Sequence, residues 1–214
     1  MRTIRFMYEP GHFGDADEAQ TVAMLRSTGF GHLVVIDGER FEASPLPFLV
    51  DDDLSVVRVH VARPNRIWRL APCPAFLAVT ASDAYISPSW YASTAEHGRV
   101  VPTWNYEVVY LHGRLIAHDD DAWIADQMRD LTDHHEADMA APWSVDDPPN
   151  GFVEKMRRGT VGLQLHVTRI ESKRKLGQNR SQDDIGGAVS GLRAEGGSQG
   201  EPVASAMEHT AWPA

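Results

Sequence analysis

Hydrophobic and polar residues alternate along much of the chain with the two-residue period of a β-strand. In residues 54–62, Val57, Val59 and Val61 alternate with an arginine and a histidine. Successive side chains of a strand point to opposite faces, so this pattern predicts a half-buried strand. Further apolar runs of strand length lie at residues 32–36, 75–81 and 161–170. The chain is therefore expected to be built mainly of short strands.

The region after the first of these runs has the signals of a hairpin. Asp37-Gly38 is a dipeptide that favours a tight two-residue turn. The returning segment, residues 40–50, carries Pro45 and Pro47. Proline has no N–H to donate to a neighbouring strand, so this segment is predicted to lie at the edge of a sheet or to be interrupted.

Residues 103–118 complete the strand pattern, and we expect them to form two strands with a turn at His112-Gly113. About five to seven short strands with few helices favour a small antiparallel barrel with helices packed outside it. The predicted fold class is therefore mainly β with peripheral helices.

Two segments have helical signals instead. Residues 15–28 are predicted to form a helix with Asp15 as its N-cap. Residues 120–137 are predicted to form a second helix, with Asp120 or Asp121 as its N-cap and apolar residues on one face. Shorter helices are predicted near residues 151–158 and after Ser181.

The length of 214 residues suits one medium-sized domain with a sizeable core. We assign residues 1–193 to that domain, with a helical appendage at its C-terminal end. Residues 194–214 are rich in Gly, Ser and Ala, and this composition predicts a poorly ordered tail.

Composition restricts the partners and the compartment. The formal net charge of −10 opposes non-specific nucleic-acid binding, because such binding depends on Lys and Arg neutralising phosphates. The single cysteine, Cys73, fits a reducing compartment, and no apolar run reaches the roughly 18–20 residues that cross a bilayer. The N-terminus lacks the apolar core of a secretory signal. These features predict a cytoplasmic protein without a membrane partner.

Several common catalytic and binding motifs are absent from the sequence. It contains no Walker-type loop, no G-x-G-x-x-G after a strand and no C-x-x-C. His134-His135-Glu136 resembles a metal cluster only superficially, because neighbouring helical residues point in different directions, and we interpret it as a solvated helix end. No recognition helix of the helix-turn-helix type is evident, and no metal site or catalytic residue is predicted.

Three segments carry candidate chemistry, each with a plainer alternative. HVARPNRIW (60–68) offers a phosphate site or a turn with a surface arginine. AYISPSWYASTAEHGRVVPTWNY (84–106) offers either a surface for a planar ligand or ordinary packing of aromatic rings. KRKLGQNRSQDD (173–184) offers donors for a carbonyl-rich or phosphorylated ligand, or a solvated turn. Spacing alone does not choose between these alternatives.

Taken together, VHVARPNRIW, AYISPSWY, VVPTWNY and KLGQNR resemble the PaiB-type proteins, the FMN-binding negative transcriptional regulators of bacteria. MYEPGHF near the N-terminus and EASPLPF fit the same pattern, and the resemblance covers roughly residues 1–193. It implies a split β-barrel of the FMN-binding type, which is normally a homodimer with the flavin in a groove between subunits.

The resemblance also implies a set of cofactor-binding residues. They are Ser44, Leu46, His60, Val61, Ala62, Arg63, Asn65, Thr103, Trp104, Asn105, Gln178, Asn179 and Arg180. Arg63 and Asn65 would hold the FMN phosphate. The other residues up to Ala62 would line the isoalloxazine and ribityl groups. Residues 103–105 would lie near the ring or the dimer seam, and residues 178–180 would close the site.

The chain departs from the family pattern at several of these motifs. Pro45 stands where the family usually has His, and Thr94 stands where it usually has Lys. Ser82-Asp83 replaces a common Gly-Pro, and Gly177 replaces a Ser. The first two departures remove donors that could contact a flavin.

Three functions follow from the resemblance. The first is an FMN-binding protein acting as a negative transcriptional regulator, although the acidic charge does not support direct DNA binding. The second is a flavin-dependent oxidoreductase of the split-barrel class, so whether the chain is an enzyme stays open. The third is haem binding, with a histidine as ligand.

Overall fold

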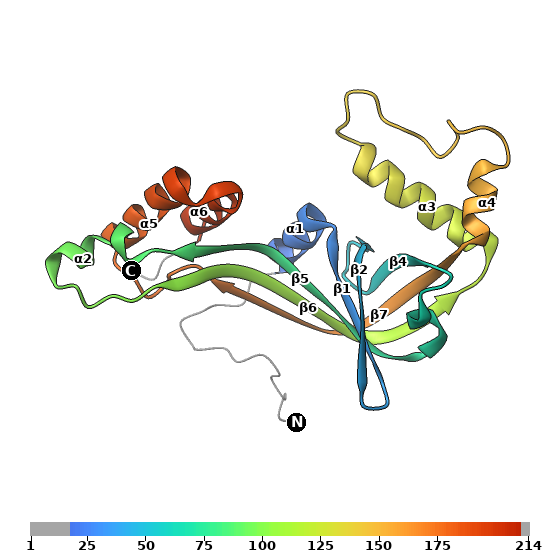
Figure 1. Cartoon of the computed structure of the whole chain (residues 1–214), viewed down its shortest axis with the longest axis horizontal. Coiled ribbons are helices and arrows are strands. Elements are labelled where there is room, and N and C mark those ends of the chain that lie inside the picture. Colours follow the sequence, from blue (N-terminus) through green and yellow to red (C-terminus); the bar gives the residue numbers. More distant parts are fainter. Residues whose placement is uncertain (1–17, 211–214) are drawn as a thin grey trace. The chain divides into compact units, whose positions relative to one another are not determined.

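The computed structural model describes residues 18–210, which form β-strands, α-helices and 3-10 helices (Figure 1). The strands are β1 (Phe30–Asp37), β2 (Arg40–Pro47), β3 (Leu49–Val50), β4 (Val56–Ala62), β5 (Cys73–Ile86), β6 (Thr103–His118) and β7 (Thr160–Lys175). The α-helices are α1 (Glu18–Thr28), α2 (Ala92–Glu96), α3 (Asp121–Glu136), α4 (Phe152–Arg158), α5 (Gln182–Glu195) and α6 (Gly200–Glu208). The 3-10 helices are η1 (Arg66–Leu70), η2 (Pro88–Trp90) and η3 (Gly197–Gln199).

The strands form a seven-stranded sheet in the order β2-β1-β5-β6-β7-β4-β3. β1 and β2 pair antiparallel around the turn after Asp37, with Asp37 opposite Arg40, so the predicted hairpin is confirmed. β2, which contains Pro45 and Pro47, lies at one end of this order, as the prolines predict for an edge strand. The fold class predicted from the sequence, mainly β with peripheral helices, is confirmed.

Alternation in β4 also matches its prediction. Val57, Val59 and Val61 are each no more than 6% exposed, whereas Arg58 and His60 on the other face are half-buried. β4 pairs antiparallel with β7, with Val59 opposite Leu163. Apolar side chains of both strands therefore enter the same core.

Residues 103–118 differ from the prediction, because they form one continuous strand and not a pair with a turn at His112-Gly113. A Cβ placed on Gly113 would lie 2.0 Å from the carbonyl oxygen of His166 in β7. The glycine thus permits a close approach of two backbones, a use of glycine that the sequence does not distinguish from a turn.

Two compact units make up the described chain. Unit 1 contains residues 18–24, 80–109 and 171–210, and unit 2 contains residues 25–79 and 110–170. The long strands β5, β6 and β7 contribute residues to both units. The sequence predicted a single domain for residues 1–193, so this division is one that only the structure reveals.

The core of unit 1 includes residues from the end of β5 and from helices α5 and α6. The two helices lie side by side in Figure 1. The buried residues of this core are Ala84, Ile86, Tyr91, Leu176, Ile185, Ala188, Val189, Leu192, Val203, Ala204 and Met207. A Cβ on Gly191 of α5 would lie 2.3 Å from the indole of Trp90, so the missing side chain lets that ring pack directly on the helix.

Helix α6 occupies part of the segment that was expected to be a poorly ordered tail. Val203, Ala204 and Met207 are at most 1% exposed. Their spacing places them on one helical face, which packs into the core of unit 1. Burial of this short stripe offsets the low helix propensity of the surrounding glycines and serines. Asp15 and the MYEPGHF motif lie outside the described residues.

Helix α3 begins as the sequence predicts. The backbone N–H of Trp123 donates to Asp120 Oδ1 at 2.9 Å, which identifies Asp120 as the N-cap. Ile124, Gln127 and Leu131 form its buried face. Within residues 18–210, no helix is both long enough and apolar enough to cross a membrane.

Candidate functional site

The residues expected to bind a cofactor fall into two groups, one in each unit. Unit 2 holds Ser44, Leu46, His60, Val61, Ala62, Arg63 and Asn65. Unit 1 holds Thr103, Trp104, Asn105, Gln178, Asn179 and Arg180. Within each unit the structure brings residues together that are distant in sequence, as the contacts below show.

Asn65 and Ser44 are in direct contact in unit 2. Asn65 Nδ2 donates to Ser44 Oγ at 2.8 Å, and Asn65 Oδ1 accepts the backbone N–H of Ile67 at 3.0 Å. Asn65 is therefore the N-cap of η1 and joins the start of that helix to strand β2. Ser44 is 8% exposed, so this hydroxyl lies largely inside the unit.

Arg63, the predicted phosphate ligand, is already held by protein acceptors. Its Nε donates to the carbonyl oxygen of Arg158 at 2.9 Å, and Nη1 donates to Asp119 Oδ2 at 2.9 Å. Nη2 donates to Asp119 Oδ1 and, at 3.1 Å, to the carbonyl oxygen of Thr160. The hydrogen bond raises the pKa of Arg63 and lowers that of Asp119. Phosphate at this guanidinium would have to compete with a carboxylate.

His60 has a different environment, although it lies only three residues away. Its Nδ1 is buried and has no hydrogen-bond partner within residues 18–210. Burial lowers the pKa of the imidazole, because it disfavours the charged form. A neutral ring with a buried, unpaired nitrogen is a group that a bound ligand could satisfy.

The remaining predicted residues of unit 2 contribute less side-chain chemistry. Leu46 is 3% and Val61 6% exposed, and both side chains belong to the core. Ala62 is exposed at the end of β4. Leu46 and Val61 can therefore offer a ligand only backbone groups.

In unit 1, the side chain of Lys175 joins two of the predicted residues. Its Nζ donates to Thr103 Oγ1 at 2.5 Å and to the carbonyl oxygen of Trp104. Trp104 is 53% exposed and meets Tyr85 edge to face, with ring centroids 6.2 Å apart. These contacts place an exposed aromatic pair beside a lysine.

Asn105 and Gln178 serve the fold of unit 1. Asn105 is 2% exposed, and its Nδ2 donates to the sulfur of Met207 at 3.3 Å. Gln178 Oε1 accepts the N–H of Leu176 at 2.9 Å, and its Nε2 donates to the carbonyl oxygen of Arg174 at 2.7 Å. Both side chains thus stabilise the turn after β7 and the helices beside it.

Arg180 and Asn179 complete the predicted set. The guanidinium of Arg180 lies over the ring of Tyr91 at 4.6 Å from its centroid, a cation–π geometry. Asn179 is exposed. The turn therefore presents a cation and an amide at its surface.

The structure adds two lysines that the predicted set did not include. Lys173 Nζ and Lys175 Nζ lie 5.7 and 5.8 Å from the ring centroid of Tyr106. The pKa of Lys175 is lowered, chiefly by burial and further by the charges of Lys173 and Arg180. The sequence signal was the K-R-K spacing, because residues two apart in a strand share a face.

On the opposite face, the intervening Arg174 belongs to a buried ion pair. Its Nε donates to Glu107 Oε1 at 2.7 Å, and Ser82 Oγ donates to Glu107 Oε2 at 2.9 Å. The side chains of Arg174 and Glu107 are 12% and 10% exposed. The two faces of this strand end therefore differ: one holds paired charges, and the other gathers cations beside aromatic rings.

For the aromatic stretch 84–106 the sequence left two alternatives, core packing or a surface for a planar ligand, and the structure shows some of its rings in each environment. Tyr91 is 5% exposed, and Trp90 packs on Gly191, so these rings fill the core of unit 1. Tyr85 and Trp104 are 45% and 53% exposed. Part of the stretch is packing, and part is available as a binding surface.

Neither alternative involves a metal within the described chain. No group of three or more His, Cys, Asp or Glu side chains there is arranged to hold a metal ion. His134 and His135 meet edge to face, with ring centroids 5.2 Å apart.

Comparison with known families yields one match, to residues 7–169. The matching family is described as "Putative FMN-binding domain". Over 206 residues the chain is 28% identical to the Protease synthase and sporulation protein PAI 2 of Bacillus subtilis, covering 94% of this chain and 97% of that protein.

Matches to fungal proteins are shorter. Uncharacterized proteins of Aspergillus fumigatus and Emericella nidulans are 27% and 28% identical over 58% and 56% of this chain. The matched regions amount to 53% and 52% of those proteins, so the chain spans about half the length of these relatives.

Solved structures with a similar fold include flavin-binding proteins. The FAD and heme binding protein from Mycobacterium smegmatis aligns with a TM-score of 0.55 and 16% identity, over 82% of this chain and 79% of that one. The flavocytochrome Anf3 from Azotobacter vinelandii aligns with a TM-score of 0.53 and 19% identity, over 74% and 67%. At these identities the likeness concerns the fold alone, and it agrees with the predicted split barrel.

Proposed function

Because the chain belongs to the FMN-binding domain family whose model it matches, we propose that it is a flavoprotein that uses cationic and aromatic residues of unit 1 to hold FMN. FMN is the cofactor that family membership supports. The observation that carries the assignment of residues is the gathering of Lys173, Lys175 and Arg180 near Tyr106 and Tyr91 in unit 1.

The chemistry of this group suits FMN. Burial, together with the charges of Lys173 and Arg180, lowers the pKa of Lys175, and a bound phosphate dianion would favour its charged form. The exposed rings of Trp104 and Tyr85 suit a planar ligand such as the isoalloxazine.

The division of roles proposed here modifies the one implied by the family motifs. Asp119 engages Arg63 on two nitrogens, and the hydroxyl of Thr94 donates to the carbonyl oxygen of Pro88. Because Asp119 would compete with a phosphate for Arg63, we assign the main phosphate contacts to Lys175 and Arg180, which lie with Lys173 beside the aromatic rings of unit 1. Arg63 and Asn65 would then stabilise the end of β4 and the start of η1 in unit 2. Bound FMN supplies one- and two-electron redox chemistry, and the protein determines its orientation and solvent access.

We further propose that two copies of the chain associate. Tyr85, Val101 and Trp104 of unit 1 are 45%, 66% and 53% exposed, and large apolar side chains at a surface favour burial against a partner. A second copy is the partner implied by the split-barrel resemblance. Light scattering of the purified protein tests this: a monomeric mass at micromolar concentration would contradict it.

We also propose, from the similarity to PaiB-type proteins, that the protein is a negative transcriptional regulator. Because the net charge is −10, any DNA contact would depend strongly on salt. Gel-shift titration of fragments from upstream of the gene, at low and high salt, is the test. If no fragment shifts even at low salt, direct regulation by this chain alone is ruled out.

The cofactor assignment is tested with the purified protein. Its visible spectrum should show a flavin, and chromatography after heat denaturation should identify the released flavin as FMN. Titration of flavin-free protein with FMN, FAD and riboflavin should then give the tightest binding with FMN. A protein that arrives colourless and binds none of the three would overturn the proposal, and a Soret band would indicate haem instead.

A further inference from the structure

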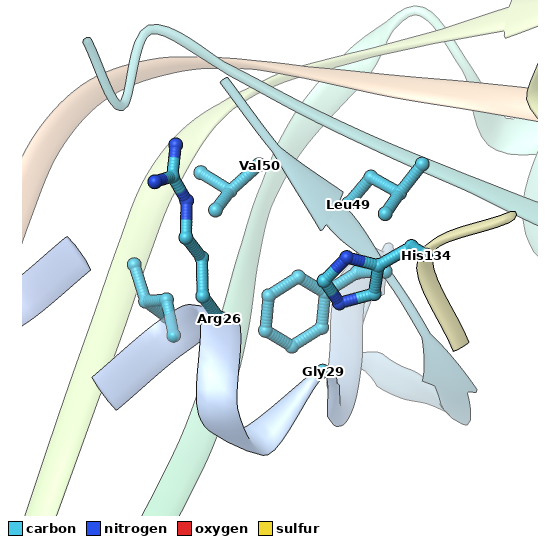
Figure 2. A pocket seen from close by; sticks show the side chains of 7 residues that line it. Arg26, Gly29, Leu49, Val50 and His134 are labelled. Carbon is cyan, nitrogen blue, oxygen red and sulfur yellow. The ribbon is translucent and has the colours of Figure 1, made fainter. Parts of the chain in front are cut away.

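A pocket of about 350 Å³ lies in unit 2, and its lining shares no residue with the proposed FMN site. Its lining residues are Leu25, Arg26, Gly29, Phe48, Leu49, Val50 and His134. They come from the end of α1, the turn into β1, the segment around β3 and the end of α3. Figure 2 shows Arg26 and His134 on opposite sides of this pocket, with Gly29 at one edge.

The pocket has an apolar interior. Leu25 is fully buried and Phe48 is 2% exposed, and Leu49 and Val50 are half-buried. Ligand pockets usually combine such an apolar lining with a few polar groups that fix orientation, in volumes of roughly 300–1,000 Å³. The volume here lies at the small end of that range and suits a compact ligand.

The polar groups of the lining favour an anion. Arg26 carries a permanent positive charge, and His134 provides an imidazole. None of the lining residues is acidic. A carboxylate entering the pocket would therefore meet a guanidinium and an imidazole.

Acidic residues do follow the lining in sequence, so their positions matter. Asp52 pairs with Arg26, but its side chain is 96% exposed. An exposed ion pair contributes little free energy, so a ligand carboxylate could replace Asp52 at small cost. Asp53 accepts the N–H of Ser55 at 3.0 Å, and that contact lowers its pKa and holds it in the turn. Neither carboxylate occupies the pocket.

We propose that this pocket binds a small monocarboxylate with a compact apolar body, such as an aryl or branched-chain acid. The apolar body would lie against Phe48, Leu49 and Val50. The carboxylate would accept from Arg26 in place of Asp52, with His134 as a second donor. This proposal does not depend on FMN binding, since the lining shares no residue with the proposed FMN site.

Three probes of one shape separate charge from size: phenylacetate, the neutral phenylacetamide and the cationic phenethylamine. Titrations of the purified protein are followed by calorimetry and by amide resonance shifts. We expect phenylacetate to bind at least about tenfold more tightly than phenylacetamide, because a charge-assisted hydrogen bond is lost with the amide. Phenethylamine should bind more weakly still, and the largest shifts should centre on Gly29 and Val50.

Two variants and one control locate the site. Arg26→Gln should weaken phenylacetate binding about tenfold and leave phenylacetamide binding nearly unchanged. Val50→Phe should fill the pocket and weaken all three probes. Arg40→Gln removes the same charge from the hairpin turn of the same unit and should change nothing.

The proposal is overturned if phenylacetate does not bind the wild-type protein, if Arg26→Gln binds it as tightly as wild type, or if phenethylamine binds as tightly as phenylacetate. The Arg26 result stands by itself if Val50→Phe fails to fold. Failure of the protein to bind any flavin would contradict the function proposed above, but it would leave these titrations unaffected.

Discussion

The two units treat their cationic residues in opposite ways. In unit 2, Arg63 is bound by Asp119 through two nitrogens and by two backbone carbonyls. In unit 1, Lys175 is a partly buried cation whose neighbours Lys173 and Arg180 lower its pKa. The arginine of a recognisable motif is thus paired with a carboxylate, whereas the phosphate contact that we propose comes from a cluster of cations that includes two lysines outside the predicted set. The positive charge of Arg63 is thus offset by a carboxylate, whereas the cations of unit 1 lie beside one another.

Unit 1 also contains the buried ion pair between Arg174 and Glu107, and removing one partner of this pair should have the largest effect on the free energy of unfolding. Glu107→Gln would leave Arg174 buried without its countercharge, and removal of one partner from a buried pair costs about 3–5 kcal/mol. Urea unfolding followed by circular dichroism measures the loss. Glu201→Gln is the matched control, because it breaks a pair with Arg193 whose side chains are 64% and 42% exposed, and should cost at most about 1 kcal/mol. Equal losses in the two variants would show that the Arg174 pair is not buried.

The second-largest effect is expected at the cluster of cations in unit 1. Lys175→Gln should weaken FMN binding about tenfold or more, since a charge-assisted contact to phosphate is lost, while riboflavin binding should change much less. Fluorescence titration with both flavins makes the comparison. Lys155→Gln removes an exposed lysine of α4 and serves as the control. If FMN and riboflavin lose affinity equally, Lys175 does not contact the phosphate.

A smaller effect is expected from freeing the arginine of unit 2. Asp119→Asn keeps the shape of the side chain but removes the charge that engages Arg63, so FMN affinity should stay the same or rise slightly. Stability should fall by no more than about 1 kcal/mol, because the side chains of this pair are 37% and 55% exposed. A large gain in FMN affinity would return Arg63 to the role of main phosphate ligand.

The smallest expected effect is a contribution of Lys175 to the pH dependence of the protein's stability. Its lowered pKa means that the unfolded chain binds this proton more tightly than the folded one, so this lysine destabilises flavin-free protein at neutral pH. That cost should diminish as pH rises through the lowered pKa of the folded state, and it should vanish above about 10.4, the ordinary pKa of lysine, where the side chain is mostly neutral in both states. Lys175→Met should therefore be stabilising relative to wild type at pH 7, and its advantage should shrink at higher pH. An advantage that grows with pH would contradict the lowered pKa.

Much of the fold was predictable, because its signals are local. The turn after Asp37, the edge position of the strand with Pro45 and Pro47, and the cap at Asp120 each depend on a few neighbouring residues. Gly113 shows where such reasoning ends: a glycine in a strand signals either a turn or a close approach, and only the position of β7 distinguishes them. The order of α6 depends likewise on a core that the sequence does not display.

The candidate site was predictable only as a set of segments. The motifs containing Arg63, Trp104 and Gln178 were identified from the sequence, and each of these residues takes part in a hydrogen bond within its unit. Their roles were less accessible, since Gln178 closes a turn. The pocket beside Arg26 had no sequence signal, because its lining is drawn from segments that are far apart along the chain.

By itself, the sequence determined the alternation of β4, the hairpin, the helix caps and the family, since each depends on residue order over a short span. Only the tertiary structure decided which charges are compensated. Asp119 reaches Arg63 from 56 residues away, and Arg174 meets Glu107 from 67 residues away. Electrostatic energy depends on distance in space and on burial, neither of which is written in the spacing of a motif. The side chains most available to a ligand were therefore determined by the fold.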